Sequence, residues 1–279
     1  MKSFIPKTMD ELCRDLSQMT AHDKIVGGGT DLAIELNNGR ISPEALLYIG
    51  DIEELHTVGE ESGHVRIGAC ATMHEIVTAG IIGREYGAVL DAAEGIGSSQ
   101  VRNRATIGGN IAGASPGADM LPALFLHRAE IEIISPGGLY RKPITEIVLG
   151  ASETCLKYNE AITAINLPPP PHKNYTSVFI KLGHRQKVSI ARISLAVGLA
   201  FGKDGVISFA DIVAGAISTL PVHVSKAEKI LTGSTITQET KRKVGEALSE
   251  LILELTPEKE YKASAALGIA EDVLGAMQH

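Results

Sequence analysis

The sequence predicts an α+β protein, in which a small βαβ-like lobe and a larger mixed α/β lobe precede a C-terminal antiparallel sheet with helices. Near the start, a short strand, a glycine run and a helix follow one another. Four consecutive prolines at 168–171 cannot continue a helix or join a central strand. Strand-like segments and then helical periodicity follow the prolines. We therefore predict a first domain over residues 1–170, divided near residue 50, and a second over residues 171–279.

Capping boxes predict where several helices begin. In this pattern a hydroxyl residue is followed three positions later by Glu, and each side chain satisfies a backbone N–H of the other residue. The pattern occurs at Thr8 with Glu11, at Thr72 with Glu75, and at Ser225 with Glu228. Apolar residues at helical spacing follow the first box, and further helices are predicted over 74–79, 86–93, 121–127, 243–253 and 263–277.

The first lobe has the order of a βαβ unit. Residues 24–26 form a predicted strand that ends at a run of three glycines, 27–29. Thr30 is placed to N-cap a helix over residues 31–37, which we expect to stop at Gly39. In this arrangement the N-terminus of the helix faces a bound anion.

Alternation and β-branched residues predict the later strands. The segments 47–49 and 64–68 indicate strands of a separate sheet, and 129–135 and 161–167 are further strands before the prolines. After the prolines, segments 176–182, 193–201 and 206–213 predict an antiparallel sheet, with a hairpin turn at 202–205.

Composition and charge exclude several classes of protein. The chain has 279 residues, of which 44% are hydrophobic and 21% charged, as is typical of globular domains. A net charge of −7 argues against a nucleic-acid partner, because a phosphate backbone needs a cationic face. The first residues lack the apolar region of a secretory signal, and no apolar run approaches the roughly 20 residues of a membrane helix. We expect a cytoplasmic protein that binds neither nucleic acid nor membrane.

The cysteines and histidines predict no metal or catalytic cluster. Cys13, Cys70 and Cys155 stand far apart and form no C-x-x-C pair, so we interpret them as small buried apolar residues. None of the nine histidines has another four positions away. We therefore predict no zinc ligands, no iron–sulfur ligands and no catalytic residues in this chain.

Two glycine-rich segments predict a diphosphate site. Segment 26–32 reads VGGGTDL and segment 106–116 reads TIGGNIAGASP. Glycine lets backbone N–H groups turn toward a ligand, so two such loops could hold both ends of a diphosphate. The first segment has Leu32 where a Rossmann loop requires its third glycine, and the chain has no Gly-Lys-Ser/Thr of a P-loop. Asp31 is expected either to cap its helix or to accept hydrogen bonds from a ribose. Asp119 is expected to contact ribose or flavin in preference to a role in a turn.

These segments resemble the FAD-binding subunit of molybdenum hydroxylases, a family that includes the medium subunits of bacterial xanthine, carbon monoxide and nicotinate dehydrogenases. The likeness rests on segment 26–32, on segment 100–110 with Ser115, Pro116 and Asp119, and on segments 179–185 and 189–191, which look like the family's lysine-containing strand. It covers nearly the whole chain.

The resemblance implies a flavin site and an electron-transfer function. It implies FAD contacts from Ile25, Val26, Gly27, Gly28, Gly29, Thr30, Asp31, Leu32, Thr106, Ile107, Gly108, Gly109, Asn110, Ser115, Asp119, Thr163 and Lys181. Lys181 would approach the flavin ring, and Ile96 stands where the family often places a stacking aromatic residue. The family's partner subunits carry the molybdenum cofactor and 2Fe-2S clusters, and FAD passes electrons to NAD or another acceptor.

Two other functions remain open from the sequence. A self-sufficient flavin oxidoreductase would reduce its flavin directly with a small substrate. A nucleotide-binding assembly module would keep the glycine segments without redox function.

Overall fold

The structure, a computed structural model, describes residues 1–183 and 189–278, which fall into two compact units. The first unit contains residues 1–81, 98–114 and 128–168, and the second contains residues 82–97, 115–127 and 169–279. His184 and Arg185 of the lysine-containing segment lie outside the described residues. The division into domains at residue 170 stays a prediction.

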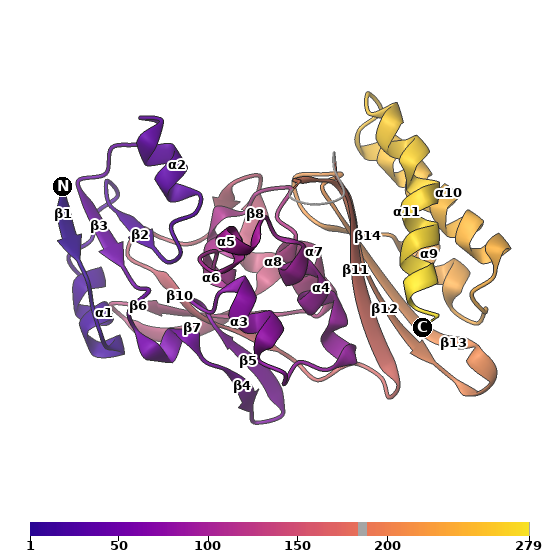
Figure 1. Cartoon of the computed structure of the whole chain (residues 1–279), viewed down its shortest axis with the longest axis horizontal. Helices are drawn as coiled ribbons and strands as arrows, with labels where there is room; N and C mark the ends of the chain where they lie inside the picture. The colour runs from indigo at the N-terminus through magenta and orange to yellow at the C-terminus, as the bar shows by residue number, and fades with distance from the viewer. Residues whose placement is uncertain (184–188, 279) are drawn as a thin grey trace. The chain divides into compact units, whose positions relative to one another are not determined.

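The first unit begins with a small parallel sheet in the order β1 (Lys2–Phe4), β3 (Ala45–Tyr48), β2 (Lys24–Val26) (Figure 1). Helix α1 (Met9–Leu16) packs here, with Leu12 and Leu16 fully buried. The predicted start of α1 is confirmed, because the Thr8 hydroxyl accepts the Glu11 N–H at 3.2 Å. The prediction that segment 47–49 belongs to a separate sheet is wrong, since β3 is the central strand between β1 and β2.

Helix α2 (Leu32–Asn37) follows the glycine run and buries none of its residues. The prediction that Thr30 caps it is wrong. Asp31 occupies the N-cap position and makes no side-chain capping bond. The first turn already starts at Gly29, whose carbonyl accepts the Ala33 N–H at 3.0 Å, so the Thr30 side chain has no capping position to fill.

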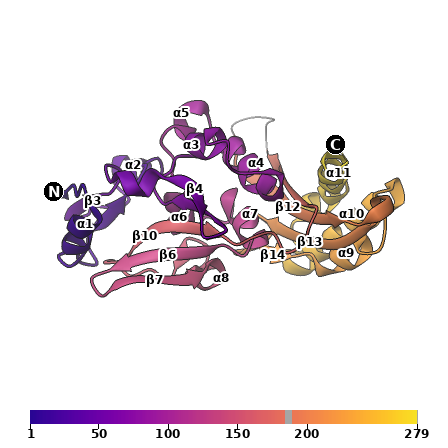
Figure 2. The ribbon, with the colours of Figure 1, turned by 90° about the horizontal axis from the view of Figure 1, so that it is seen from below.

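The larger sheet of the first unit has the order β4 (Val58–Glu61), β5 (His64–Gly68), β10 (Ala161–Leu167), β6 (Glu130–Ser135), β7 (Gly138–Pro143), with every pair antiparallel. Figure 2 shows β10, β6 and β7 side by side. The strands predicted over 64–68, 129–135 and 161–167 are confirmed. Four short elements complete this part: η1 (Glu53–His56), α8 (Ile144–Ile147), β8 (Val148–Gly150) and β9 (Glu153–Thr154).

Three helices of the first unit lie between these strands in the sequence. Both bonds of the predicted capping box are present at the start of α3 (Met73–Thr78), since Thr72 and Glu75 each accept the other's backbone N–H. Helix α5 (Ser99–Arg102) leads into α6 (Ile107–Gly113). The second glycine segment is therefore largely helical rather than a loop, because Gly108 and Gly109 lie inside α6.

The second unit is built on an antiparallel sheet in the order β11 (Tyr175–Gly183), β12 (Ala191–Phe201), β13 (Ile207–Gly215), β14 (Val222–His223). This confirms the predicted antiparallel sheet, with η3 (Lys203–Gly205) in the turn. Helices α9 (Ser225–Leu231), α10 (Gln238–Leu255) and α11 (Glu260–Ala276) cover one face. Alternate residues of β12, Leu195 and Val197, pack with Leu248 and Leu274 into one buried core.

Helices α4 (Gly87–Gly95) and α7 (Met120–Leu126) lie against the same sheet, with η2 (Arg84–Tyr86) before α4. Every residue of α7 is buried. Gly87 is required where η2 ends, since a Cβ there would lie 2.3 Å from the Ser177 carbonyl oxygen on β11.

The capping box predicted at Ser225 and Glu228 is wrong. Val224 occupies the N-cap position of α9, and no side chain caps this helix. Glu228 instead accepts the Ile212 N–H of β13 at 3.0 Å.

Among residues 1–183 and 189–278, no helix combines the length and the apolar character needed to cross a membrane.

Candidate functional site

The first glycine segment lies at the end of β2, against the chain that precedes α6. A Cβ on Gly28 would lie 1.8 Å from the carbonyl oxygen of Arg104, so no other residue fits this close approach without a backbone shift. Gly29 has φ +74°, in the left-handed region that favours glycine. The triple glycine is therefore explained first by packing of the chain on itself and by the turn into α2.

The second glycine segment is held by backbone hydrogen bonds to Ala69 and Ala71, which follow β5. Thr106 N-caps α6 by accepting the Gly109 N–H at 3.2 Å. Gly108 is buried and donates its N–H to the Ala69 carbonyl at 2.9 Å. A Cβ on Gly108 would lie 2.8 Å from that same carbonyl oxygen. The glycine thus lets α6 begin directly against Ala69.

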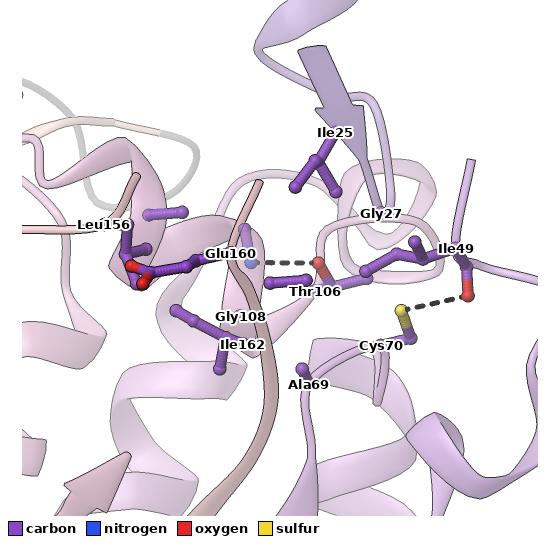
Figure 3. Close-up of a pocket in the computed structure, with 13 residues that line it drawn as sticks. Ile25, Gly27, Ile49, Ala69, Cys70, Thr106, Gly108, Leu156, Glu160 and Ile162 are labelled. Atoms are coloured by element: carbon purple, nitrogen blue, oxygen red, sulfur yellow. Dashed lines mark hydrogen bonds between the residues drawn. The ribbon is translucent and has the colours of Figure 1, made fainter. Parts of the chain in front are cut away.

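The two segments meet at Thr106. A Cβ on Gly27 would lie 3.0 Å from the Thr106 hydroxyl oxygen. Gly27 and Thr106 line a cavity of about 90 Å³ together with Gly108 and Gly109 (Figure 3). The rest of its wall is mainly apolar and includes Ile25, Ile49, Cys70 and Ile162. The structure therefore brings both predicted glycine segments to one pocket within the first unit.

The Cys70 thiol in this pocket is inert at neutral pH. Burial raises the pKa of Cys70 to about 12, and its Sγ donates to the Ile49 carbonyl at 3.6 Å (Figure 3). Since the thiolate is the reactive form of cysteine, the prediction of a small buried apolar residue is confirmed for Cys70.

Asn110 carries an unsatisfied buried polar atom. Its side-chain oxygen Oδ1 is buried and has no hydrogen-bond partner among the residues that the structure describes. A buried polar atom without a partner is rare in proteins and is costly unless a ligand or water supplies the bond. The Asn110 oxygen therefore fits a bound group that offers a hydrogen-bond donor, such as a ribityl or ribose hydroxyl of FAD.

Thr163 lies on β10 at a break in the strand register, between Ile162 and Ala164. Its hydroxyl donates to the Glu132 carboxylate at 3.0 Å, and its carbonyl accepts the Ala69 N–H at 3.0 Å. These groups of Thr163 are therefore occupied within the protein, and its predicted backbone contact with the flavin stays a prediction.

Glu132 is the centre of a charged network in the first unit. Its carboxylate accepts hydrogen bonds from Arg66 at 3.0 Å and from Arg141 at 2.8 Å, as well as from Thr163. Burial alone would raise the pKa of Glu132, but the bonds from Arg141, Arg66 and Thr163 hold it below its usual value. The network joins β5, β6, β7 and β10, and it includes Thr163, whose carbonyl accepts the Ala69 N–H.

Lys181 and Asp119 form a buried ion pair in the second unit. The Lys181 ammonium on β11 donates to a carboxylate oxygen of Asp119 and, at 2.9 Å, to the carbonyl of Gly95. Their side chains are 15% and 5% exposed. Burial raises the pKa of Asp119 to about 6, although the charge of Lys181 acts to lower it. The other oxygen of Asp119, Oδ1, is buried without a partner among the described residues and is therefore a second acceptor suited to a ligand hydroxyl or N–H.

The remaining predicted residues of these segments are more exposed. Thr30 is half-buried, and Asp31 is exposed at the start of α2. Ser115 is exposed, and its hydroxyl accepts the Gly117 N–H at 3.4 Å. Ile96 is half-buried and ends α4.

The structure gathers the predicted residues into two groups. The first unit contains Ile25 to Leu32, Thr106 to Asn110 and Thr163, and the second unit contains Ser115, Asp119 and Lys181. Sequence reasoning missed Gly95, whose carbonyl fixes Lys181, and Glu132, which holds Thr163. A carbonyl partner leaves no signal in side-chain types, whereas a buried Glu between apolar residues of a strand is a signal that can be searched for.

Comparison with known proteins agrees with this geometry. The family described as "FAD binding domain in molybdopterin dehydrogenase" matches residues 1–170. The family described as "CO dehydrogenase flavoprotein C-terminal domain" matches residues 179–276. The first match covers more than half of the chain, and within the first unit the unsatisfied oxygen of Asn110 fits the cofactor that it names.

Individual relatives extend along nearly the whole chain. The nicotinate dehydrogenase FAD-subunit of Eubacterium barkeri is 29% identical over 273 residues, which are 95% of this chain and 92% of that protein. The xanthine dehydrogenase FAD-binding subunit of Escherichia coli O157:H7 is 28% identical and covers 86% of this chain and 82% of its own.

A solved structure shows the same fold. One chain of carbon monoxide dehydrogenase from Hydrogenophaga pseudoflava superposes with a TM-score of 0.87 at 26% identity, over 99% of this chain and 96% of its own. The predicted α+β class is confirmed, and FAD is the cofactor. The chain is a member of the family of FAD-binding subunits of molybdenum-dependent dehydrogenases.

Proposed function

We propose that this chain is the electron-transfer subunit of a molybdenum-dependent hydroxylase complex. Bound FAD would supply the electron-transfer chemistry between iron–sulfur clusters of a small partner subunit and NAD or another acceptor. A large partner subunit with the molybdenum cofactor oxidises the substrate. The observation that carries the proposal is that both glycine segments line one pocket, in a chain whose relatives are FAD subunits of dehydrogenases.

The residues of this chain would bind and orient the cofactor. The backbone of Gly27 to Gly29 and of Thr106 to Asn110 would hold the diphosphate and ribityl groups, with the Asn110 oxygen as a hydrogen-bond acceptor. Asp119 supplies a further acceptor, and Lys181 has three N–H donors, of which Gly95 and Asp119 accept two. Cofactor chemistry of this kind needs position and electrostatics from the protein rather than an acid–base pair of its own.

The proposal is tested by purifying the tagged chain from its native host and measuring flavin, iron and molybdenum. We expect one FAD for each chain, with iron and molybdenum on proteins that co-purify. The purified full chain, separated from its partners, should keep its flavin oxidised when candidate substrates are added. Absence of flavin, even after incubation with FAD, would refute the proposal.

A matched pair of glycine variants separates cofactor binding from assembly. A Cβ on Gly109 would lie 2.9 Å from the Thr106 hydroxyl, whereas a Cβ on Gly113 meets nothing within 4 Å. We expect Gly109→Val to lose flavin and electron transfer while Gly113→Val keeps both. Full electron transfer by a flavin-free Gly109→Val complex would show that the chain is only an assembly module. Bleaching of the flavin by substrate in the isolated chain would show a self-sufficient oxidoreductase.

A further inference from the structure

Three side chains that can bind metal ions converge at the edge of the second unit's sheet, and the flavin site does not use them. Asp211 is on β13, His223 on β14 and Glu228 in the first turns of α9. His223 Nδ1 lies 3.0 Å from Asp211 Oδ1 and 3.2 Å from Glu228 Oε1. One ligand atom from each residue lies within 4.8 Å of the other two.

The backbone holds these groups in place. The Ile212 N–H donates to Glu228 Oε1 at 3.0 Å, and the Val224 N–H donates to the Ile212 carbonyl at 2.9 Å. These bonds fix the start of α9 against β13. The Asp211 side chain is 4% exposed, whereas that of His223 is 46% exposed. The fold thus positions the carboxylates, and the half-exposed imidazole makes the cluster accessible from solvent.

The distances suit a small tetrahedral cation. Zinc binds histidine nitrogen and carboxylate oxygen at about 2.0–2.2 Å, which separates two ligand atoms of a tetrahedron by about 3.3–3.5 Å. The two measured separations from His223 Nδ1 are only a few tenths of an ångström shorter. Three protein ligands with the fourth position open to water is a known zinc arrangement. We propose that Asp211, His223 and Glu228 bind one Zn²⁺ ion, with water as the fourth ligand.

A proton competes with the metal for the same position. His223 Nδ1 lies within hydrogen-bond distance of both carboxylates, so a proton on this nitrogen occupies the position that a metal ion would take. Zinc needs the deprotonated nitrogen, so the affinity for zinc should rise with pH.

The test is calorimetric titration of zinc chloride into the full chain at pH 7 and pH 8. We expect one site, with tighter binding at the higher pH. His223→Gln should weaken binding by about 100-fold or more, and so should Asp211→Asn and Glu228→Gln. His56→Gln is the matched control, because His56 pairs with a single carboxylate, that of Glu75, at 3.4 Å. This control should keep the native zinc affinity.

Two outcomes would overturn the proposal. Failure of the native chain to bind zinc at pH 8 would show that the cluster is an ion pair alone. Unchanged affinity in His223→Gln would place the zinc elsewhere, on the cysteines for example. Circular dichroism and flavin content check that each variant folds. If Asp211→Asn does not fold, His223→Gln still decides the test, because His223 is half-exposed. Neither outcome bears on the proposed electron transfer, because the flavin residues are not changed.

Discussion

Gly108 and Gly113 lie in the same helix, α6, and replacing each by Ala separates packing from helix propensity. A methyl group at Gly108 would lie 2.8 Å from both the Cβ and the carbonyl oxygen of Ala69 and 3.2 Å from its Cα. At Gly113 it would meet nothing within 4 Å. Ala69 cannot move aside freely, because its carbonyl accepts the Gly108 N–H and its own N–H donates to Thr163.

The magnitudes follow from these contacts. Forcing an extra methyl group into a packed site costs about 1–3 kcal/mol. Replacing Gly by Ala within a helix raises the free energy of unfolding by up to about 1 kcal/mol, and by less at the last residue of the helix. We expect Gly108→Ala to lower the free energy of unfolding by about 1–2 kcal/mol and Gly113→Ala to leave it unchanged or slightly higher. Because Gly108 also lines the pocket, Gly108→Ala should bind less FAD.

Urea unfolding of the flavin-free chain measures the free energy of unfolding without the contribution of bound cofactor. Fluorimetric titration with FAD measures the loss of cofactor binding. The reasoning would be refuted if Gly108→Ala were as stable as Gly113→Ala. That result would mean that the contact between α6 and Ala69 yields without cost and that Gly108 is not a packing requirement.

Two further predictions concern the buried charges. Lys181→Met removes the cation beside Asp119, so the pKa of Asp119 should rise above about 6, as carbon NMR of labelled aspartate can measure. A carboxyl group whose pKa is raised in the folded state contributes stability at low pH, and this stability is lost as pH increases through that pKa. The Lys181→Met variant should therefore lose more stability than the native chain between pH 5 and pH 8. An unchanged pH profile would contradict the ion pair. Glu132 has a lowered pKa, so its contribution is present above its unfolded pKa and is lost as pH falls through its folded pKa. Glu132→Gln should therefore be less stable than the native chain at pH 7 by about 1–3 kcal/mol and should lose less stability on acidification. If the variant lost as much stability on acidification as the native chain, the network with Arg66 and Arg141 would not be linked to folding.

Local patterns predicted much of the fold. The capping box at Thr72 predicted α3 because both partners belong to one turn, and the β-branched runs predicted β10 and β12. The same kind of pattern failed at Ser225, where Glu228 bonds to β13 instead of its own helix. The partner of that side chain, Ile212, stands 16 positions earlier in the chain, so the four-residue pattern of the box contains only one of the two residues.

Residues of both predicted glycine segments line one pocket, and two of their glycines have packing roles that the first interpretation did not include. Gly28 and Gly108 are required by contacts with Arg104 and Ala69, which a sequence pattern cannot show. Likewise, Asp119 and Lys181 were each expected near the cofactor, yet their direct bond and the shared Gly95 carbonyl arise only from tertiary packing. Asp211, His223 and Glu228 have no recognised ligand spacing, so their proximity could not be predicted.

The order in which the second unit's segments occur along the chain has a consequence for biosynthesis. Helix α7 is buried along its whole length and packs against β12 and β13, which begin only at Ala191. As the ribosome releases the chain from its N-terminus, this apolar helix emerges before the sheet that covers it exists. Until β12 and β13 are made, the apolar residues of α7 lack the strands that bury them, so the second unit can finish folding only after these strands have emerged.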